Sequence, residues 1–292
     1  MLPRHCLACL ALMALTFGAA AETRPHSALP SVHVLPALAM PGLDRQRTIR
    51  IYLPPGYANT SRRFPVLYMH DGQNLFDDAT SYAGEWGVDE SLDGLAKSHG
   101  LEVIVVGIDN GQEQRMSELN PWPGLMFRIH FGPAEGEEYV DFIVKVVKPW
   151  IDAHYRTKPD RANTAIMGSS MGGLISDYAI HRYPQVFSKA GIFSPSYWVS
   201  DDAYEFAEEK PLPGDARVVL LAGGKEGEDT VEDLNRMAAV LRGNGLGSDR
   251  LSVKVAPDGE HNEAFWRREF PAAVTWLFDA RPVAAMATPA AP

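Results

Sequence analysis

The sequence predicts an α/β fold, in which one mostly parallel central sheet carries helices on both faces. The first observation is that short apolar runs alternate along the chain with longer amphipathic stretches, the order typical of strands joined by helices. The second is that several runs consist almost entirely of valine, isoleucine and leucine, which indicates strands covered on both faces. The third is composition, because 46% of the 292 residues are hydrophobic and can form a large core.

Expected strands and helices are distributed along the middle of the chain. Strands are expected at residues 48–53, 66–70, 103–108, 164–167, 189–193, 218–222 and 251–255. At residues 137–155, apolar side chains recur every three or four positions, which predicts an amphipathic helix with one buried stripe. Further helices are expected at residues 171–182, 230–241 and 262–278. No internal repeat or long polar linker is present, so we expect a single domain over residues 43–280.

The two ends of the chain differ from the middle. Residues 1–21 combine a basic start with a short apolar run and then small residues, the order of a secretory signal peptide cleaved after Ala21. An uncleaved anchor is the alternative, although the run is shorter than the ~20 residues that a membrane span needs. We expect residues 22–42 to form an N-terminal extension and residues 281–292 a disordered Ala/Pro-rich tail. The mature chain is therefore expected to be periplasmic or secreted, without a membrane span.

Charge and cysteine content argue against several classes of function. The formal net charge of −10 disfavours a general electrostatic attraction to nucleic acid or anionic lipid. Both cysteines, Cys6 and Cys9, lie in the expected signal peptide, so the mature chain would carry no disulfide and no cysteine metal site. We therefore expect a small-molecule ligand, no metal, no cofactor and no nucleic-acid partner, and the oligomeric state stays open.

Residues 168–173, GSSMGG, contain a GxSxG motif between an expected strand and an expected helix. This context is what a nucleophile elbow requires, namely a very sharp turn that exposes a strained serine. The positions two before and two after that serine need to lack a side chain, and Gly168 and Gly172 meet this need. Ser170 is therefore the candidate nucleophile, whereas Ser169 is out of register with the motif.

A serine hydroxyl becomes a good nucleophile only when a base takes its proton. Two histidines follow Ser170 in the chain. His181 lies on the same expected helix as the serine, about 16 Å further along at a rise of 1.5 Å per residue. His261 lies in a polar loop between the last expected strand and the last expected helix. His261 is therefore the candidate base, with an ordinary loop or helix-capping role as the alternative.

A carboxylate is then needed to orient the histidine and to stabilise its charged form. The strand expected at residues 218–222 leads into a loop with several acidic side chains. Glu226 is the first carboxylate after the strand and is the candidate acid. Asp229 is its competitor, although the next helix is expected to begin near Asp229, where an acid can simply cap the helix.

An acyl-transfer reaction also needs two backbone N–H donors for its oxyanion, one of them normally from the residue after the nucleophile. Met171 holds that position. The second donor is expected from a loop after an earlier strand, where Gly72 would let the backbone turn so that Gln73 presents its amide. We interpret His70 and Asp71, beside them, as structural hydrogen-bonding residues.

Several longer motifs together resemble a known family. They are MHDGQNLFDD at 69–78, EWGVDESLD at 85–93, GIDNGQEQRMSELNPW at 107–122, GSSMGG at 168–173, FSPSYW at 193–198 and GEHNEAFW at 259–266. In this combination, over about residues 43–280, the chain resembles an esterase family of the α/β-hydrolase superfamily. Its relatives include enterochelin, salmochelin, feruloyl and acetylxylan esterases, S-formylglutathione hydrolase and mycolyl transferases.

The resemblance implies an α/β-hydrolase fold and assigns a role to each matching position. It implies Ser170 as nucleophile, His261 as base, Glu226 as acid, and Gln73 and Met171 as oxyanion donors. Many relatives carry aspartate at the acid position, so the glutamate departs from the usual pattern of the family.

Residues 109–138 show few strand or helix signals, and a loop of about 30 residues in a compact domain is usually functional. We interpret this loop as a lid over a pocket for an aryl ester or an anionic ligand, lined by Arg115, Trp122, Phe127, Arg128 and Phe131. The alternative is a packed lid core with solvated arginines. Trp86 and Trp198 are similar to pocket-wall positions of the relatives, and packing is the alternative role for both.

We therefore expect an exported serine hydrolase that cleaves carboxylic esters through an acyl-enzyme. The resemblance and the expected export favour siderophore or plant-cell-wall esters, hydroxycinnamoyl or acetyl, over a cytosolic formylglutathione substrate. Two alternatives stay open. One is acyl transfer to an alcohol by the same triad, and the other is a catalytically inactive hydrolase fold used as a binding module.

Overall fold

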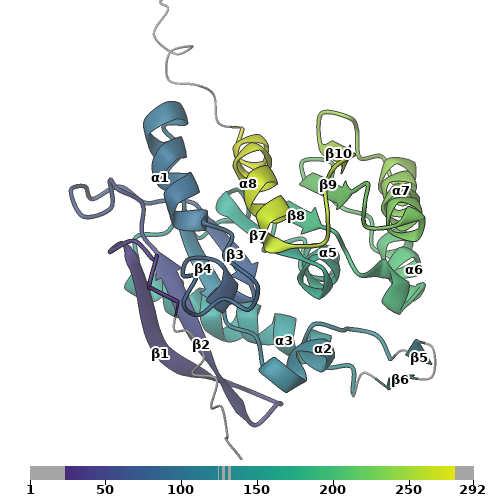
Figure 1. The fold of residues 1–292 in the computed structure, drawn as a ribbon, viewed down its shortest axis with the longest axis horizontal. Coiled ribbons are helices and arrows are strands. Elements are labelled where there is room, and N and C mark those ends of the chain that lie inside the picture. The colour runs from purple at the N-terminus through teal and green to yellow at the C-terminus, as the bar shows by residue number, and fades with distance from the viewer. Residues whose placement is uncertain (1–23, 124, 127–128, 131–132, 280–292) are drawn as a thin grey trace, which may run out of the picture.

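The computed structural model describes residues 24–123, 125–126, 129–130 and 133–279. Within these residues, the fold is built on an eight-stranded sheet with the strand order β1-β2-β4-β3-β7-β8-β9-β10 (Figure 1). The signal peptide expected at residues 1–21 and the tail expected at residues 281–292 lie outside the described residues.

Most of the central sheet is parallel, as the sequence predicts. The parallel strands, in their order across the sheet, are β4 (Ile104–Ile108), β3 (Val66–His70), β7 (Thr164–Ser169), β8 (Lys189–Phe193), β9 (Arg217–Gly223) and β10 (Leu251–Ala256). β2 (Arg45–Tyr52) lies antiparallel to β4, and β1 (Val32–Met40) lies antiparallel to β2. Apart from β1, these strands correspond to the apolar runs of the sequence.

The edge strand β1 differs from the expectation, because it lies inside the range 22–42 and joins the sheet. Most of its side chains are exposed or half-buried, so it lacks the apolar run by which a buried strand is recognised. Pro36 also interrupts its pattern, and the pairing register with β2 shifts between Leu35 and Leu38. An edge strand tolerates proline at such an irregularity.

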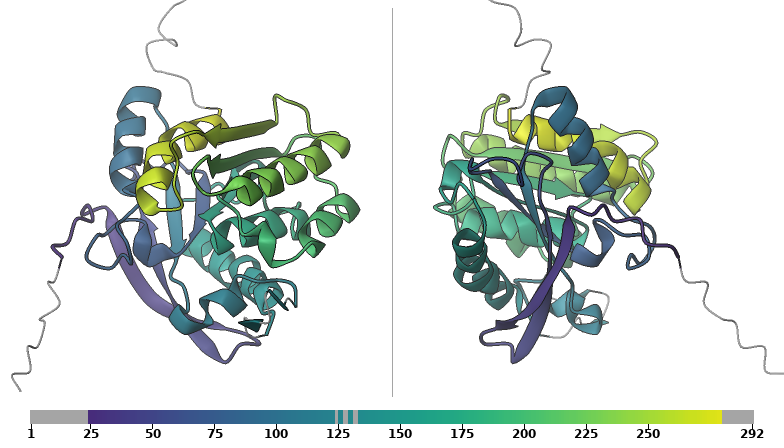
Figure 2. Two further views of the ribbon diagram at one scale, coloured as in Figure 1. Left: turned by 45° about the vertical axis from the view of Figure 1, so that its right-hand side comes forward. Right: turned by 90° about the vertical axis from the view of Figure 1, so that its left-hand side faces the viewer.

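Helices cover both faces of the sheet (Figures 1 and 2). α1 (Val88–His99) and α8 (Glu263–Leu277) pack on one face, and the other core includes α5 (Met171–Arg182), α6 (Asp202–Glu209) and α7 (Glu228–Gly243). The side chains of each strand alternate between the two cores. In β3, for example, Val66 and Tyr68 face the α5 side, whereas Leu67 and Met69 face the α8 side. The predicted two-faced α/β architecture is confirmed.

The helix expected at residues 137–155 is present, but its hydrogen-bonding pattern changes in the middle. α3 (Gly136–Phe142) continues into the π-helical turn η3 (Ile143–Val147) and then into α4 (Lys148–His154). Pro149 at the start of α4 has no N–H to donate to the preceding turn, which accounts for the local change. The buried members of the expected apolar stripe are Tyr139, Phe142, Ile143, Val147 and Ile151.

The stretch 109–138 contains more regular structure than expected. Its short elements are η2 (Gln112–Gln114), α2 (Arg115–Glu118), β5 (Leu125–Met126), β6 (Ile129–His130) and the start of α3. Elements of one turn or two residues are too short to produce a periodic sequence pattern. Phe127, Arg128 and Phe131, which are predicted as lid residues, lie outside the described residues.

The parallel strands bring the candidate site residues to one edge of the sheet. Because β3, β4, β7, β8, β9 and β10 run in the same direction, the loops that follow them meet at their carboxyl ends, where α/β sheets bind ligands. In the part of the chain that the structure describes, no helix is long and apolar enough to cross a membrane.

Candidate active site

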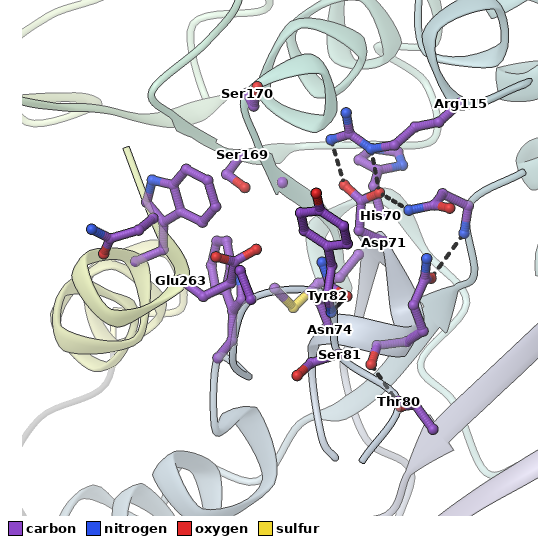
Figure 3. A pocket seen from close by; sticks show the side chains of 18 of the residues that line it. His70, Asp71, Asn74, Thr80, Ser81, Tyr82, Arg115, Ser169, Ser170 and Glu263 are labelled. Atoms are coloured by element: carbon purple, nitrogen blue, oxygen red, sulfur yellow. Dashed lines mark hydrogen bonds and ion pairs between the residues drawn. The ribbon is translucent and has the colours of Figure 1, made fainter. Parts of the chain in front are cut away.

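A cavity of about 890 Å³ lies at the carboxyl ends of the strands. Its walls come from the loops after β3, β4 and β7, from residues 80–83 and from the loop that leads into α8 (Figure 3). Ser170 and His261 both line this cavity although they are far apart in the chain. Gln73, Trp86 and Arg115 line it as well.

Ser170 occupies the sharp turn between β7 and α5. Its backbone has φ 58° and ψ −124°, a conformation that is strained for any residue with a side chain. Two backbone hydrogen bonds hold the turn against the loop after β8. The Ser170 N–H donates to the Phe193 carbonyl at 2.9 Å, and the Ser196 N–H donates to the Ser170 carbonyl at 3.1 Å. This is the geometry of a nucleophile elbow.

Close contacts explain the glycines around the elbow. A Cβ atom at Gly168 would lie 2.7 Å from the carbonyl oxygen of Gly172 and 2.8 Å from Cδ2 of His70. A Cβ atom at Gly173 would lie 2.8 Å from the carbonyl oxygen of Phe193. At Gly172 the nearest atom would be Cβ of His70 at 3.3 Å, which is tight but not prohibitive. The structure therefore requires Gly168 and Gly173 more strictly than Gly172.

His261 and Glu226 form a hydrogen-bonded pair beside the cavity. Nδ1 of His261 lies 2.8 Å from Oε2 of Glu226, whose carboxylate is buried, whereas the histidine side chain is 45% exposed. Burial acts to raise the pKa of Glu226, but hydrogen bonds from His261, Ser194 and the Gly223 N–H leave that pKa below its usual value. A buried, ionised carboxylate of this kind holds an imidazole in one tautomer and orientation.

Ser194 and the Gly223 N–H hold Glu226 in place, and Trp266 in turn holds Ser194. The Ser194 hydroxyl donates to Oε1 of Glu226 at 2.7 Å and accepts the indole N–H of Trp266 at 2.9 Å. The Gly223 N–H donates to the same carboxylate oxygen at 2.7 Å. Ser194 and Trp266 belong to the motifs FSPSYW and GEHNEAFW, which mark both segments as related to the esterase family. No spacing rule predicts that two residues 72 positions apart contact each other.

The competing acid and base lie elsewhere. Asp229 is exposed in the first turn of α7, where an acid favours the positive end of the helix. His181 is buried, and its Nδ1 lies 2.6 Å from the carbonyl oxygen of Lys210. Neither residue lines the cavity.

The hydroxyl group of Ser170 contacts another serine. Its Oγ lies 3.2 Å from Oγ of Ser196, which is buried at the start of the short turn η5 (Tyr197–Val199). Among the described residues, Ser170 has no hydrogen bond to His261, so the candidate nucleophile and base share a cavity without direct contact. Ser196 is a further neighbour of the nucleophile that the GxSxG motif alone does not reveal.

The two candidate oxyanion donors belong to the turns after β7 and β3. Met171 is the first residue of α5, so its N–H has no acceptor within the helix. Gln73 lies in the 3₁₀ turn η1 (Gly72–Asn74), and its side-chain oxygen accepts the Asn110 N–H at 3.0 Å. That hydrogen bond ties the turn after β3 to the loop after β4.

The tight point of this turn is one residue earlier than expected. Asp71, rather than Gly72, adopts the left-handed conformation, with φ 55°. Gly72 is needed for a different reason, because a Cβ atom there would lie 2.7 Å from Oδ1 of Asp109 and 2.8 Å from the backbone of Gly107. The glycine therefore permits close packing against β4 rather than a special backbone angle.

Arg115 lines the cavity, but its charge is already engaged. Its Nε donates to Oδ1 of Asp71 at 2.6 Å, and its Nη2 donates to Oδ2 at 2.9 Å (Figure 3). Burial acts to raise the pKa of Asp71, but the paired guanidinium and a hydrogen bond from Asn110 keep that pKa below its usual value. The guanidinium of Arg115, which was expected to bind an anionic ligand, is thus already paired with Asp71.

Of the three tryptophans predicted to line the pocket, Trp86 lines it and is buried. Trp122 does not, because it packs edge-on against the rings of Tyr178 and Phe206. Trp198 is 42% exposed and is not part of the cavity wall either. Sequence spacing cannot tell which side of a loop an aromatic ring faces. Across the described residues, no group of three or more histidine, cysteine or acidic side chains is arranged to hold a metal ion.

Comparison with known proteins agrees with this geometry. Residues 41–277 match the protein family described as "Putative esterase". The chain belongs to this esterase family. The resemblance seen in the sequence motifs is therefore confirmed, over nearly the range expected for the domain.

Three related sequences align with between half and four fifths of this chain. The uncharacterized protein YbbA of Bacillus subtilis is 28% identical over 80% of this chain and 92% of that protein. An endo-1,4-beta-xylanase/feruloyl esterase of Xylanibacter ruminicola is 22% identical over 77% of this chain and 28% of its own length. A siderophore triacetylfusarinine C esterase of Aspergillus fumigatus is 27% identical over 54% of each chain.

Solved structures share the fold. An IroE-like serine hydrolase from Shewanella oneidensis superposes with a TM-score of 0.70 at 22% identity, over 85% of this chain and 80% of that chain. The enterobactin esterase of Shigella flexneri superposes with a TM-score of 0.68 at 18% identity, over 87% and 60% of the two chains. The predicted α/β-hydrolase fold is confirmed.

Proposed function

We propose that this protein is an exported serine esterase with Ser170, His261 and Glu226 as its catalytic residues. The observation that carries the proposal is the 2.8 Å contact between buried Glu226 and His261, beside the cavity that also contains the strained Ser170. A binding module has no use for a buried carboxylate that orients a cavity histidine. Membership of the esterase family supports ester hydrolysis as the reaction class.

The proposed reaction has two halves. Ser170 Oγ attacks the ester carbonyl carbon while its proton moves to Nε2 of His261, and Glu226 stabilises the imidazolium. The backbone N–H groups of Met171 and Gln73 donate to the oxyanion of the tetrahedral intermediate. The bond to the alcohol then breaks, and His261 returns the proton to the leaving alcohol. Water, deprotonated by the same histidine, attacks the acyl-enzyme, and the acid is released with Ser170 restored.

The proposed first step includes one local motion. The Ser170 hydroxyl lies 3.2 Å from the hydroxyl of Ser196, and in the proposed reaction it rotates about its Cα–Cβ bond toward His261. Rotation of a single side chain takes picoseconds to nanoseconds, far faster than enzymatic turnover. In this reaction, the hydrogen bond between the two serine hydroxyls breaks before Ser170 attacks the ester.

The expected signal peptide at residues 1–21 supports an exported enzyme. Relatives named as a feruloyl esterase and a siderophore esterase support hydroxycinnamoyl or siderophore-type esters as substrates. Initial rates of the purified chain on short 4-nitrophenyl esters, a feruloyl ester and a siderophore triester test the proposal, with Ser170→Ala as the blank. We expect hydrolysis by the wild type and none by the variant at unchanged thermal stability. A folded Ser170→Ala protein that retains most of the activity would refute Ser170 as nucleophile.

A further inference from the structure

Glu263 is a buried carboxyl group of the cavity that the proposed reaction does not use. It is the first residue of α8, two positions after His261, and is only 8% exposed. Its side chain lines the cavity and points into it on the side where Tyr82 lies (Figure 3). Burial raises the pKa of this carboxyl, as expected for an acid held away from water without a strong counter-charge.

No described residue neutralises Glu263. The charged groups that act on it are Asp71, His261 and Arg115, and the guanidinium of Arg115 is bound on two sides by Asp71. In the described part of the chain, Glu263 has no ion pair and no hydrogen bond from another side chain, and the hydrogen bond that it accepts comes from its own backbone N–H. Buried acids are almost always paired, because their removal from water is costly. An acid that faces the cavity without a cationic partner can receive that partner from a bound molecule.

The rest of the cavity wall is negatively charged, like Glu263. Its described walls carry the carboxylates of Asp71, Glu113 and Glu263 against the single guanidinium of Arg115. Because Arg115 is engaged by Asp71, the acids at positions 113 and 263 are not balanced by it. A negatively charged ligand group would be repelled from this wall, whereas a positively charged group would be attracted.

Aromatic rings line the same cavity. Trp86 and Trp266 are buried with their ring centroids 5.7 Å apart, whereas Tyr82 is 88% exposed. The faces of indole and phenol rings attract cations, most strongly where water is excluded. A buried carboxylate beside such rings combines two kinds of attraction for a positive group.

We infer that this wall is a subsite for a positively charged, hydrogen-bond-donating group of the substrate, such as a primary ammonium, and that Glu263 determines this specificity. The inference rests on the proposed esterase function and adds a preference within the ester class. It predicts that esters carrying an ammonium group are better substrates than neutral esters of the same shape. Esters with an anionic group near the cleaved bond are predicted to be poorer.

Two pairs of matched esters test the inference. The pair 4-nitrophenyl 6-aminohexanoate and 4-nitrophenyl heptanoate differs by an ammonium for a methyl group on the acyl side. The pair 6-aminohexyl acetate and heptyl acetate differs in the same way on the alcohol side. For the wild type we expect kcat/KM to favour the ammonium ester about tenfold in at least one pair, the size of one charge-assisted hydrogen bond. We expect Glu263→Gln to remove most of that preference.

Glu260→Gln is the matched control, because it removes the same charge three positions away. Glu260 is exposed, pairs with Lys225 and does not line the cavity, so its variant should keep the wild-type preference. The inference is overturned if the wild type shows no preference in either pair, a result that does not depend on whether Glu263→Gln folds. An equal loss of preference in both variants would overturn it too. Absence of any Ser170-dependent hydrolysis of the neutral esters would instead count against the proposed function.

Discussion

Glu226 shows how much of the site depends on a single side chain. Its carboxylate receives hydrogen bonds from His261, from Ser194 and from the Gly223 N–H, so its position and its charge are both fixed. Asp229, the alternative acid that the loop sequence allows, is exposed on α7 and has no such partners. The geometry therefore favours Glu226 as the third member of the proposed triad.

A comparison of Glu226→Gln with Asp229→Asn tests this choice. Glutamine keeps the size of the side chain but cannot stabilise the imidazolium or enforce its tautomer, so kcat should fall by roughly 10²- to 10⁴-fold. Asp229→Asn should leave kcat close to that of the wild type. Steady-state kinetics on a 4-nitrophenyl ester measure both effects, and a larger loss at position 229 would reverse the assignment.

Sequence reasoning reached Ser170, His261 and Glu226 because each lies in a loop directly after an apolar strand. It did not reach Ser194, because the contacts of that residue with Trp266 and with the acid exist only after three strand-end loops have come together. It also could not choose between a pocket wall and a packed lid core for Trp122, which contacts Tyr178 and Phe206, since sequence does not record the direction of a ring in a loop.

At the scale of the elements, the connection between β7 and α5 is tightly constrained. It packs so closely on the end of β3 that a Cβ atom at Gly168 would lie 2.8 Å from His70. By contrast, a Cβ atom at Gly94, in the exposed middle of α1, would meet nothing within 4 Å. The two glycines therefore provide a matched pair.

Gly168→Ala should lower the free energy of unfolding by about 1–3 kcal/mol, the usual cost of overpacking. Gly94→Ala should raise it by about 0.5–1 kcal/mol, because alanine restricts the unfolded chain and favours helix. Urea denaturation followed by circular dichroism measures both. Equal effects of the two substitutions would contradict the packing described for the elbow.

The strands buried on both faces were predictable, whereas several other elements, among them the 12-residue helix α1, the helix α6 and the edge strand β1, were not. Strands buried on both faces carry continuous apolar runs, so β3, β4, β7, β8, β9 and β10 stand out in the sequence. The edge strand β1 is mostly exposed and contains Pro36, and the hairpin of β5 and β6 has two residues per strand. Tertiary contacts rather than local pattern determine these elements.

For the molecule as a whole, the burial of His70 between the sheet and the elbow links stability to pH. Burial lowers the pKa of His70 to about 4 from 6.5, with Asp71 opposing the shift and Arg115 adding to it. Between about pH 4 and pH 6.5, the His70 ring is therefore neutral in the folded protein and protonated in the unfolded chain. The stability tied to His70 is complete above pH 6.5 and is lost as the pH falls toward 4.

His70→Asn, which keeps a polar group near Tyr139, tests this link. Between pH 7 and pH 5, the free energy of unfolding should fall by about 2 kcal/mol more in the wild type than in the variant. Asp89, whose pKa burial raises to about 7, changes stability in the opposite sense but is common to both proteins. Urea titrations at the two pH values give the difference, and parallel pH profiles would contradict it.

Activation of Ser170 by His261 is tested most directly by labelling with a fluorophosphonate, which reacts with an activated serine and not with the fold alone. Peptide mass spectrometry after labelling should place one phosphonyl group on Ser170 in the wild type. His261→Ala, if folded, should be labelled orders of magnitude more slowly, because the base is gone. Labelling of another serine, or an equal rate in His261→Ala, would contradict the proposed mechanism.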